Sequence, residues 1–181
     1  MSIRPATSAD VAAVLPMVRA LCDLHQAHDP ERFKVLPDVL DRYARWLPER
    51  AADPRSVFLV AESAGTHSPG NLIAFTVGTI EPEVPIFWIP ECGWIHDLWV
   101  EPAHRGRGLA RALAREMVAR FGALGVKQVR LHTGAFNESA RRVFASAGFR
   151  PCVVEMLAPT SPNSPAPTSP ASPKVPASPR P

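Results

Sequence analysis

The sequence predicts an α/β (α+β) fold in which a mixed central β-sheet is flanked by about four helices. Two patterns predict it. Short apolar segments rich in branched and aromatic residues alternate with longer segments whose apolar residues recur every three or four positions. Along the chain these segments form a strand, two helices, three strands, a helix, a strand, a helix and a strand. That order favours helices packed on one sheet.

The end of the chain has a different composition. Residues 158–181 read APTSPNSPAPTSPASPKVPASPRP and contain one aliphatic residue besides alanine, Val175. Such a segment cannot bury a core, so we expect a disordered Pro/Ser-rich tail with intermittent polyproline II geometry. Residues 1–157 then form the folded domain, which is long enough to enclose one good core.

Charge, hydropathy and cysteine usage narrow the class of protein. The net charge of +3 is too small to indicate a nucleic-acid partner. No apolar run approaches the length of a membrane span, and the start, MSIRPATSAD, lacks the apolar core of a signal peptide. Cys22, Cys92 and Cys152 are odd in number and form no CxxC, so we expect reduced thiols. A cytoplasmic protein without a membrane or nucleic-acid partner follows.

The first half of the domain is expected to begin with a strand at 2–6. Thr7 and Asp10 fit a capping box, which predicts a helix start, and Pro16 should kink that helix or shift its true start. Its apolar face would consist of Val11, Val14, Leu15, Val18, Leu21 and Cys22.

A second helix is predicted at 37–50, with a stripe of Leu36, Leu40, Tyr43 and Leu47. Strands at 57–61 and 72–80 should form a hairpin around the turn-rich segment 63–71. The segment 81–93 contains three prolines and is expected to be a loop at the mouth of a site.

The second half continues with a strand at 95–100 and an amphipathic helix that Gly122 and Gly125 end. A strand at 126–133 follows, then a helix with Asn137 as its N-cap, and a closing strand at 149–157. The inward residues would be Ala110, Leu113, Ala114, Met117, Val118 and Phe121 in the first helix, and Ala140, Val143, Phe144 and Ala147 in the second.

The strand at 95–100 does not alternate regularly. Ile95, Leu98 and Val100 are the aliphatic residues expected to pack together, but the step of three from Ile95 to Leu98 breaks the period of two. One extra residue near His96 and Asp97 would reconcile them, which predicts a β-bulge that leaves backbone groups free for a ligand. A strand buried on both faces would give a similar pattern.

The turn after this strand is rich in glycine and arginine. It reads Arg105-Gly106-Arg107-Gly108-Leu109-Ala110 and leads into a helix, whose first N–H groups and dipole favour phosphate. It is neither a Walker loop nor a dinucleotide fingerprint. A surface turn with solvated arginines is the alternative to a phosphate cradle.

The stretch I-x-D-L-x-V-x-P-x-x-R-G-x-G-L-A at 95–110 resembles the acetyl-CoA-binding motif of the Gcn5-related N-acetyltransferase (GNAT) superfamily. Its signature, Gln/Arg-x-x-Gly-x-Gly/Ala, is met by Arg105, Gly108 and Ala110. The opening 3–7 with Asp10 resembles the family's first strand and helix. Asn137, Ala140, Phe144, Gly148 and Phe149 resemble its later N-x-x-A-x-x-x-Y-x-x-x-G-F motif. The resemblance covers about residues 2–157.

The resemblance implies acetyl-CoA as co-substrate, with no metal. Backbone groups of Leu98, Trp99 and Val100 would pair with the pantetheine arm. Amides of Arg105, Gly106, Arg107, Gly108, Leu109 and Ala110 would bind the pyrophosphate, Asn137 would reach the arm, and Phe144 would lie near the sulfur. Many relatives carry Tyr at the position of Phe144 to protonate the departing thiolate, which leaves the general acid here unassigned; water or Ser139 could serve instead.

The expected reaction is direct attack of an amine on the thioester. A strand amide near Val100 would stabilise the oxyanion, and the candidate bases are His96 and Asp97, with Glu81 and Glu91 on the adjoining loop. The resemblance to diamine acetyltransferases, which place a carboxylate at the position of His96, supports that residue. A hydrogen-bonded sheet histidine is the alternative for His96.

We therefore expect an N-acetyltransferase for a primary amine, first of a small molecule and second of a protein. The family's habit makes a homodimer the expected oligomer. A non-catalytic acyl-CoA sensor is the competing class, because Phe144 cannot act as an acid. Trp88 and Trp94 are candidates for an acceptor pocket, with a core position as the alternative for Trp94. His25 and His28 are two possible ligands without a third, which argues against a metal.

Overall fold

The computed structural model describes residues 1–63, 71–158 and 160. Contacts within the chain define one compact unit, Met1–Pro151, and a second, Cys152–Pro181. The described helices and strands all belong to the first unit. They are β1 (Ser2–Pro5), α1 (Val11–His28), α2 (Val39–Ala52), β2 (Ser56–Glu62), β3 (Leu72–Pro82), β4 (Glu91–Val100), α3 (Leu109–Ala123), β5 (Val129–Leu131) and α4 (Glu138–Ser146), with short 3-10 turns at Ser8–Asp10 and Pro102–His104.

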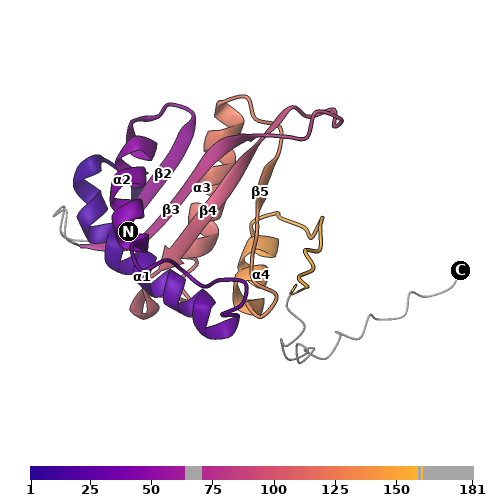
Figure 1. The fold of residues 1–181 in the computed structure, drawn as a ribbon. Coiled ribbons are helices and arrows are strands. Elements are labelled where there is room, and N and C mark those ends of the chain that lie inside the picture. The colour runs from indigo at the N-terminus through magenta and orange to yellow at the C-terminus, as the bar shows by residue number, and fades with distance from the viewer. Residues whose placement is uncertain (64–70, 159, 161–181) are drawn as a thin grey trace, which may run out of the picture. The chain divides into compact units, whose positions relative to one another are not determined.

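The strands form one mixed sheet in the order β1-β2-β3-β4-β5. The first four run antiparallel as a meander, and β5 lies parallel to β4 after the crossover through α3. Figure 1 shows the long β3–β4 hairpin at the centre of the sheet, with β5 at the edge beside β4. The predicted mixed sheet with four helices is confirmed.

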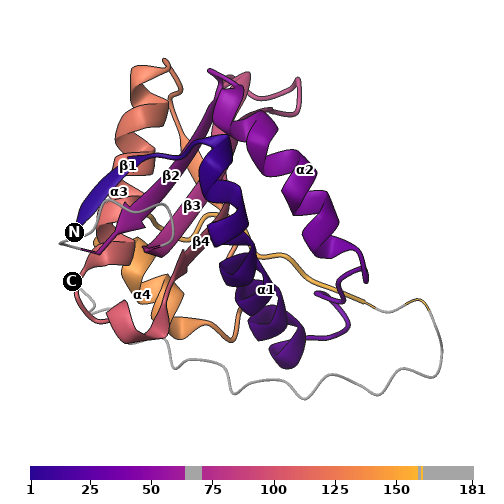
Figure 2. The same ribbon diagram turned by 90° about the vertical axis from the view of Figure 1, so that its left-hand side faces the viewer.

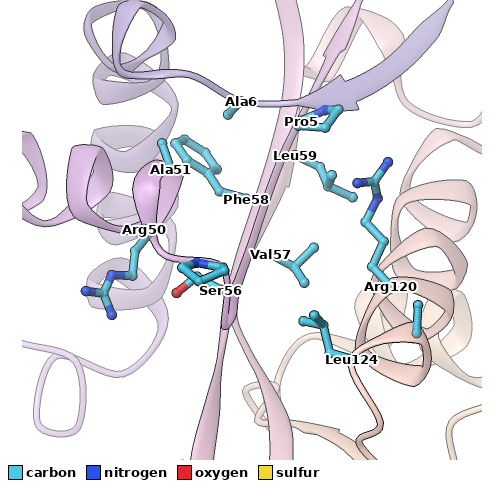
Figure 3. A pocket seen from close by; sticks show the side chains of 12 residues that line it. Pro5, Ala6, Arg50, Ala51, Ser56, Val57, Phe58, Leu59, Arg120 and Leu124 are labelled. Atoms are coloured by element: carbon cyan, nitrogen blue, oxygen red, sulfur yellow. The ribbon is translucent and has the colours of Figure 1, made fainter.

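The helices cover both faces of the sheet. Figure 2 shows α1 and α2 on one side and α3 and α4 on the other. Side chains of β2 alternate between the two layers, because successive strand residues point to opposite faces. Phe58 packs in the core under α1 and α2, whereas Val57 and Leu59 pack in the core under α3 (Figure 3).

The beginning of the chain is fixed by a buried ion network. Thr7 and Asp10 form the predicted capping box. Asp10 is 2% exposed and accepts two hydrogen bonds of 2.8 Å from the guanidinium of Arg4, which also binds the carboxylate of Glu62 in β2. This guanidinium lowers the pKa of Asp10 to about 2. The arginine therefore ties β1, the first helical turn and β2 together.

The predicted helix faces are largely those observed. The inward stripe of α1 is buried at Val11, Val14, Val18 and Leu21, with Pro16 inside the helix. In α3, Val118 is 39% exposed, so its predicted inward position was wrong. Each residue turns an α-helix by about 100°, which places Val118 on the flank of the stripe. The residues of α3 that are buried are Leu109, Leu113, Ala114, Met117 and Phe121.

Three predicted segments differ from the structure. The segment 81–93 is not all loop, because β3 continues to Pro82 and β4 begins at Glu91. The strand predicted at 126–133 is reduced to Val129–Leu131, since the ladder with β4 ends where the bulge at His96 begins. The closing strand at 149–157 does not form, and Pro151 has no amide hydrogen to donate to a ladder.

The tail predicted to be disordered lies, apart from residues 158 and 160, outside the described residues. Within the described ranges, no helix has the length and apolarity needed to cross a membrane. Cys22, Cys92 and Cys152 are free thiols.

Candidate functional site

Strand β4 has one residue more than β3 at its middle. Val77 pairs with Asp97, and the next residue, Gly78, pairs with Ile95, so His96 is left out of the ladder. This is the bulge that the spacing of the aliphatic residues predicted. It brings two successive side chains, His96 and Asp97, to the α2 side of the sheet. There His96 contacts the ring of Trp46, and Asp97 accepts a hydrogen bond from Tyr43.

The aliphatic residues on either side of the bulge share the opposite face. Ile95, Leu98 and Val100 all pack in the core under α3, as predicted, and Trp99 packs in the core under α1 and α2. His96 and Asp97 are thereby separated from the aliphatic side chains of the same strand.

The imidazole of His96 is held from β3 and α2. The hydroxyl of Thr79 lies 2.6 Å from Nε2, and the carboxylate of Glu81 lies 3.7 Å from the same nitrogen. The ring of Trp46 meets the imidazole edge-on at a centroid distance of 5.5 Å. Burial lowers the pKa of His96 and Arg50 lowers it further, whereas Glu81 raises it. Because its pKa lies below the ordinary value of about 6.5, the ring is neutral at pH 7 and can accept a proton.

Asp97 is bound to the helix layer. Tyr43 of α2 donates a hydrogen bond of 2.9 Å to its carboxylate, and Thr76 of β3 donates one of 2.8 Å to its backbone carbonyl. Burial raises the pKa of Asp97 to about 6, against the lowering effect of the Tyr43 hydrogen bond. Burial and the nearby Asp97 in turn raise the pKa of Tyr43. A carboxyl group with such a pKa can exchange a proton near neutral pH.

One edge of β4 is open beyond the bulge. In the described part of the chain, β5 pairs with β4 only at Gly93, Trp94 and Ile95. The hydrogen-bond register between β3 and β4 determines which way the backbone N–H and C=O groups of the following residues point. The amide of Glu101 donates to the carbonyl of Ile73, which makes Ala74 and Val100 a pair whose polar groups point away from β3.

By the same alternation, the N–H and C=O groups of Leu98 face the open edge and those of Trp99 face β3. Of the three residues expected to pair with a ligand arm, Leu98 and Val100 have the orientation to do so. The Val100 amide, the expected oxyanion donor, lies on this edge.

The glycine-rich turn begins where the open edge ends. Gly106 and Gly108 have φ angles of 74° and 78°, which L side chains rarely adopt, and Gly108 is the N-cap of α3. A Cβ atom at either glycine would meet nothing within 4 Å. The first turn of α3 contains no acidic side chain. A shallow hollow here is lined by Met1, Ile3, Arg107, Gly108, Leu109 and Ala112. This arrangement suits an anion.

Arg105 connects the turn to the strand. Its guanidinium donates a hydrogen bond of 2.8 Å to the carbonyl of Val100 and stacks over the ring of Trp99, with its central carbon 4.5 Å from the ring centroid. Its positive charge is therefore fixed at the end of β4, beside the turn that leads into α3.

The later motif residues lie on α4. The side chain of Asn137 caps this helix as predicted, accepting a hydrogen bond of 3.0 Å from the amide of Ala140. Phe144 is half-buried and meets Phe149 edge-on. The predicted inward residues of α4 are half-buried rather than buried.

Other predicted candidates lie elsewhere. Glu91 binds Arg55 at 2.6 Å, and Trp94 meets His132 edge-on. Trp88 is 99% exposed on the β3–β4 loop. The rings of His25 and His28 stack on Phe33 and Phe136, respectively.

A second hollow lies where β1 ends and uncovers the edge of β2, and it shares no residue with the predicted site. Figure 3 shows it between α2 and α3, with Arg50 and Arg120 on opposite sides of β2. Its lining is otherwise mostly apolar.

Sequence reasoning missed four residues that contact the bulge: Thr76, Thr79, Tyr43 and Trp46. Two signals were present. Thr79 and Glu81 are polar residues two positions apart, on one face of a mostly apolar strand. Tyr43 is the single tyrosine of the chain, and it lies on a stripe that was assigned to the core.

Comparisons with known proteins bear on the family and the fold. Over 105 residues, the chain is 32% identical to a mycothiol acetyltransferase of Thermobispora bispora. The matched residues make up 58% of this chain and 33% of the relative, so the chain spans about a third of that relative's length. A tetramutant of the BH1408 protein of Bacillus halodurans superposes with a TM-score of 0.73 at 23% identity, over 88% of this chain and 99% of the other.

An aminoglycoside antibiotic 6′-N-acetyltransferase of Acinetobacter haemolyticus superposes with a TM-score of 0.63 at 20% identity, over 89% of this chain and all of the other. At these identities the two structures show a shared fold. The sequence profile of the acetyltransferase (GNAT) family matches residues 19–149. The chain therefore belongs to the acetyltransferase (GNAT) family.

Proposed function

We propose that the protein is an N-acetyltransferase that transfers the acetyl group of acetyl-CoA to a primary amine of a small molecule. The observation that carries the proposal is the bulge, which places His96 and Asp97 together, next to the open edge of β4 and one turn before the glycine-rich loop. Membership of an acetyltransferase family supports the transfer of an acyl group. The similarity to an aminoglycoside N-acetyltransferase supports a small amine acceptor.

The cofactor would lie along three features. The pantetheine arm would pair with the outward backbone groups of Leu98 and continue past Val100, beside Trp99. The carbonyl of Val100 accepts from Arg105, and its amide is proposed for the oxyanion. The pyrophosphate would bind the amides of residues 106–110 at the start of α3, beside Arg107, because the Arg105 amide already donates to the carbonyl of Pro102. Asn137 and Phe144 on α4 would contact the arm and the sulfur end.

The acceptor amine must lose a proton before it attacks, because its unperturbed pKa is about 10.4 for a lysine-like group. His96, neutral at pH 7, would take that proton, and the carboxylate of Asp97 is the second candidate. The nitrogen then attacks the thioester carbon, and the Val100 amide stabilises the oxyanion. The thiolate can leave as an anion, because a thiol with a pKa of about 8.5 is a tolerable leaving group. Phe144 supplies no proton.

Replacing His96 tests this assignment. His96→Ala should lower kcat by roughly a hundredfold, within the usual range for a general base, while the Kd for acetyl-CoA changes less than twofold. The measurement is release of free thiol from acetyl-CoA with a panel of polyamines, aminoglycosides, amino acids and lysine peptides. Unchanged turnover in the variant would remove His96 from the mechanism.

The same panel separates the alternatives. Tight CoA binding without thiol release in the presence of any amine would favour a non-catalytic acyl-CoA sensor. That class is the alternative because Phe144 has no hydroxyl to act as an acid. Release on lysine peptides alone would favour a protein acetyltransferase.

The three free thiols support a reducing compartment, for which we propose the cytoplasm. A homodimer is the proposed oligomer, testable by light scattering.

A further inference from the structure

A buried hydroxyl lies between two titratable side chains at the bulge. Thr79 is 6% exposed and points to the same face of β3 as Glu81, two residues on. Its hydroxyl donates a hydrogen bond to the Glu81 carboxylate and lies 2.6 Å from Nε2 of His96. The three groups form a chain from carboxylate to hydroxyl to imidazole.

The single hydrogen of the Thr79 hydroxyl decides which nitrogen of the His96 ring is basic. A threonine hydroxyl has one hydrogen, and here Glu81 accepts it. The same oxygen can then only accept from His96, so Nε2 must carry the hydrogen in this contact. In the neutral ring the lone pair is consequently on Nδ1.

We propose that Thr79 and Glu81 are positioning residues that hold His96 as its Nε2–H tautomer and so make Nδ1 the atom that accepts the proton of the acceptor amine. This inference rests on the proposed role of His96 as base. The N–H bond of the ammonium breaks, the Nδ1–H bond forms, and the lone pair left on the amine nitrogen is the nucleophile. The imidazolium later returns its proton to solvent.

Charges around the ring bear on how strongly it binds the proton. Glu81 faces it from β3 at 3.7 Å and favours the imidazolium. The positive charge of Arg50 in α2 disfavours the imidazolium. The carboxylate of Asp97, the next residue in β4, accepts a hydrogen bond from Tyr43 of α2. Removing the charge of Glu81 should therefore lower the pKa of His96, move the acidic limb of the activity profile to lower pH, and weaken proton uptake at Nδ1.

The tautomer can be read without any assay of transfer. Long-range ¹H–¹⁵N correlation spectra of uniformly ¹⁵N-labelled protein at pH 8 should show His96 protonated at Nε2 in the wild type. Thr79→Val has the same shape as the wild type but no acceptor oxygen, and should give a mixture of tautomers. Thr79→Ser retains the oxygen and should keep the wild-type tautomer. Matching melting temperatures would show that all three proteins fold.

Kinetics give the second readout. With an amine that the wild type acetylates, Thr79→Val and Glu81→Gln should lower kcat about tenfold, leave the KM for acetyl-CoA unchanged, and shift the pH profile of kcat/KM; Thr79→Ser should restore both kcat and profile. An Nδ1–H tautomer in the wild type, or equal spectra and rates for the Val and Ser variants, would overturn the inference while leaving the acetyltransferase proposal intact. Failure of the proposed function is seen separately, as a wild type that acetylates no amine.

Discussion

Gly108 offers a test of the phosphate-binding turn with an internal control. Gly108 begins α3 and Gly125 follows its end, with φ angles of 78° and 87°, and a Cβ at either position meets nothing within 4 Å. A leucine should therefore cost both sites the same backbone strain, about 1–2 kcal/mol. For a domain of this size that lowers the melting temperature by about 2–8 °C.

The two variants should differ in ligand binding. At Gly108 the new side chain would occupy the space in front of the first amides of α3, where the pyrophosphate is proposed to bind. The loss of one hydrogen bond to a charged group costs about 1.5–3 kcal/mol, so the Kd for CoA should rise by about tenfold to a hundredfold. Gly125→Leu should leave the Kd within twofold of the wild type.

Isothermal titration calorimetry with CoA and thermal melting of both variants provide the two measurements. Equal melting shifts combined with a selective loss of affinity in Gly108→Leu support a phosphate site. If Gly108→Leu bound CoA as tightly as Gly125→Leu does, the turn would be a surface loop with solvated arginines, and the reasoning from its geometry would be refuted.

Two further predictions concern carboxyl groups whose pKa values are shifted in the folded protein. The folded-state pKa of Asp10 is lowered to about 2 from 3.8, so its stabilisation is complete above about pH 4 and is lost as the pH falls towards 2. Asp10→Asn should lower the free energy of unfolding by about 1–2 kcal/mol at pH 7, allowing for the partly exposed Arg4, and by much less at pH 2, as measured with urea. The pKa of Asp97 is raised to about 6 from 3.8, so the wild type loses stability as the pH rises from 4 to 6. Asp97→Asn should therefore be more stable than the wild type at pH 8, by up to about 3 kcal/mol, and equally stable at pH 3; a variant that is less stable at pH 8 would contradict the assigned burial.

The sequence predicted local features because each was written in neighbouring residues. The capping box of Thr7 and Asp10, the N-cap at Asn137 and the bulge at His96 all follow from spacings of a few positions. The bulge could be predicted because three aliphatic residues had to share one face and a strict period of two would not allow it.

The contacts of the bulge could not be predicted in the same way. Thr79 and Tyr43 come from a neighbouring strand and from a helix 54 positions before Asp97, and their meeting depends on register and helix packing. The apolar run of β3 concealed Thr79 because that strand is buried on both faces.

The register of β4 bears on why His96 is present. Trp94 pairs with Thr79 and Ile95 with Gly78, and Asp97 pairs with Val77. Without His96, these residues of β4 would still alternate regularly and would keep the faces they now occupy. The packing of the two cores therefore does not require the extra residue.

What the extra residue does is interrupt the ladder. The pairs with β5 end at Ile95, immediately before His96, and beyond that point the outward groups of Leu98 and Val100 have no strand beside them in the described part of the chain. One residue thus brings an imidazole next to Thr79 and coincides with the opening of the strand edge. Since the fold would be complete without it, the chemistry of the site is the better explanation for its presence.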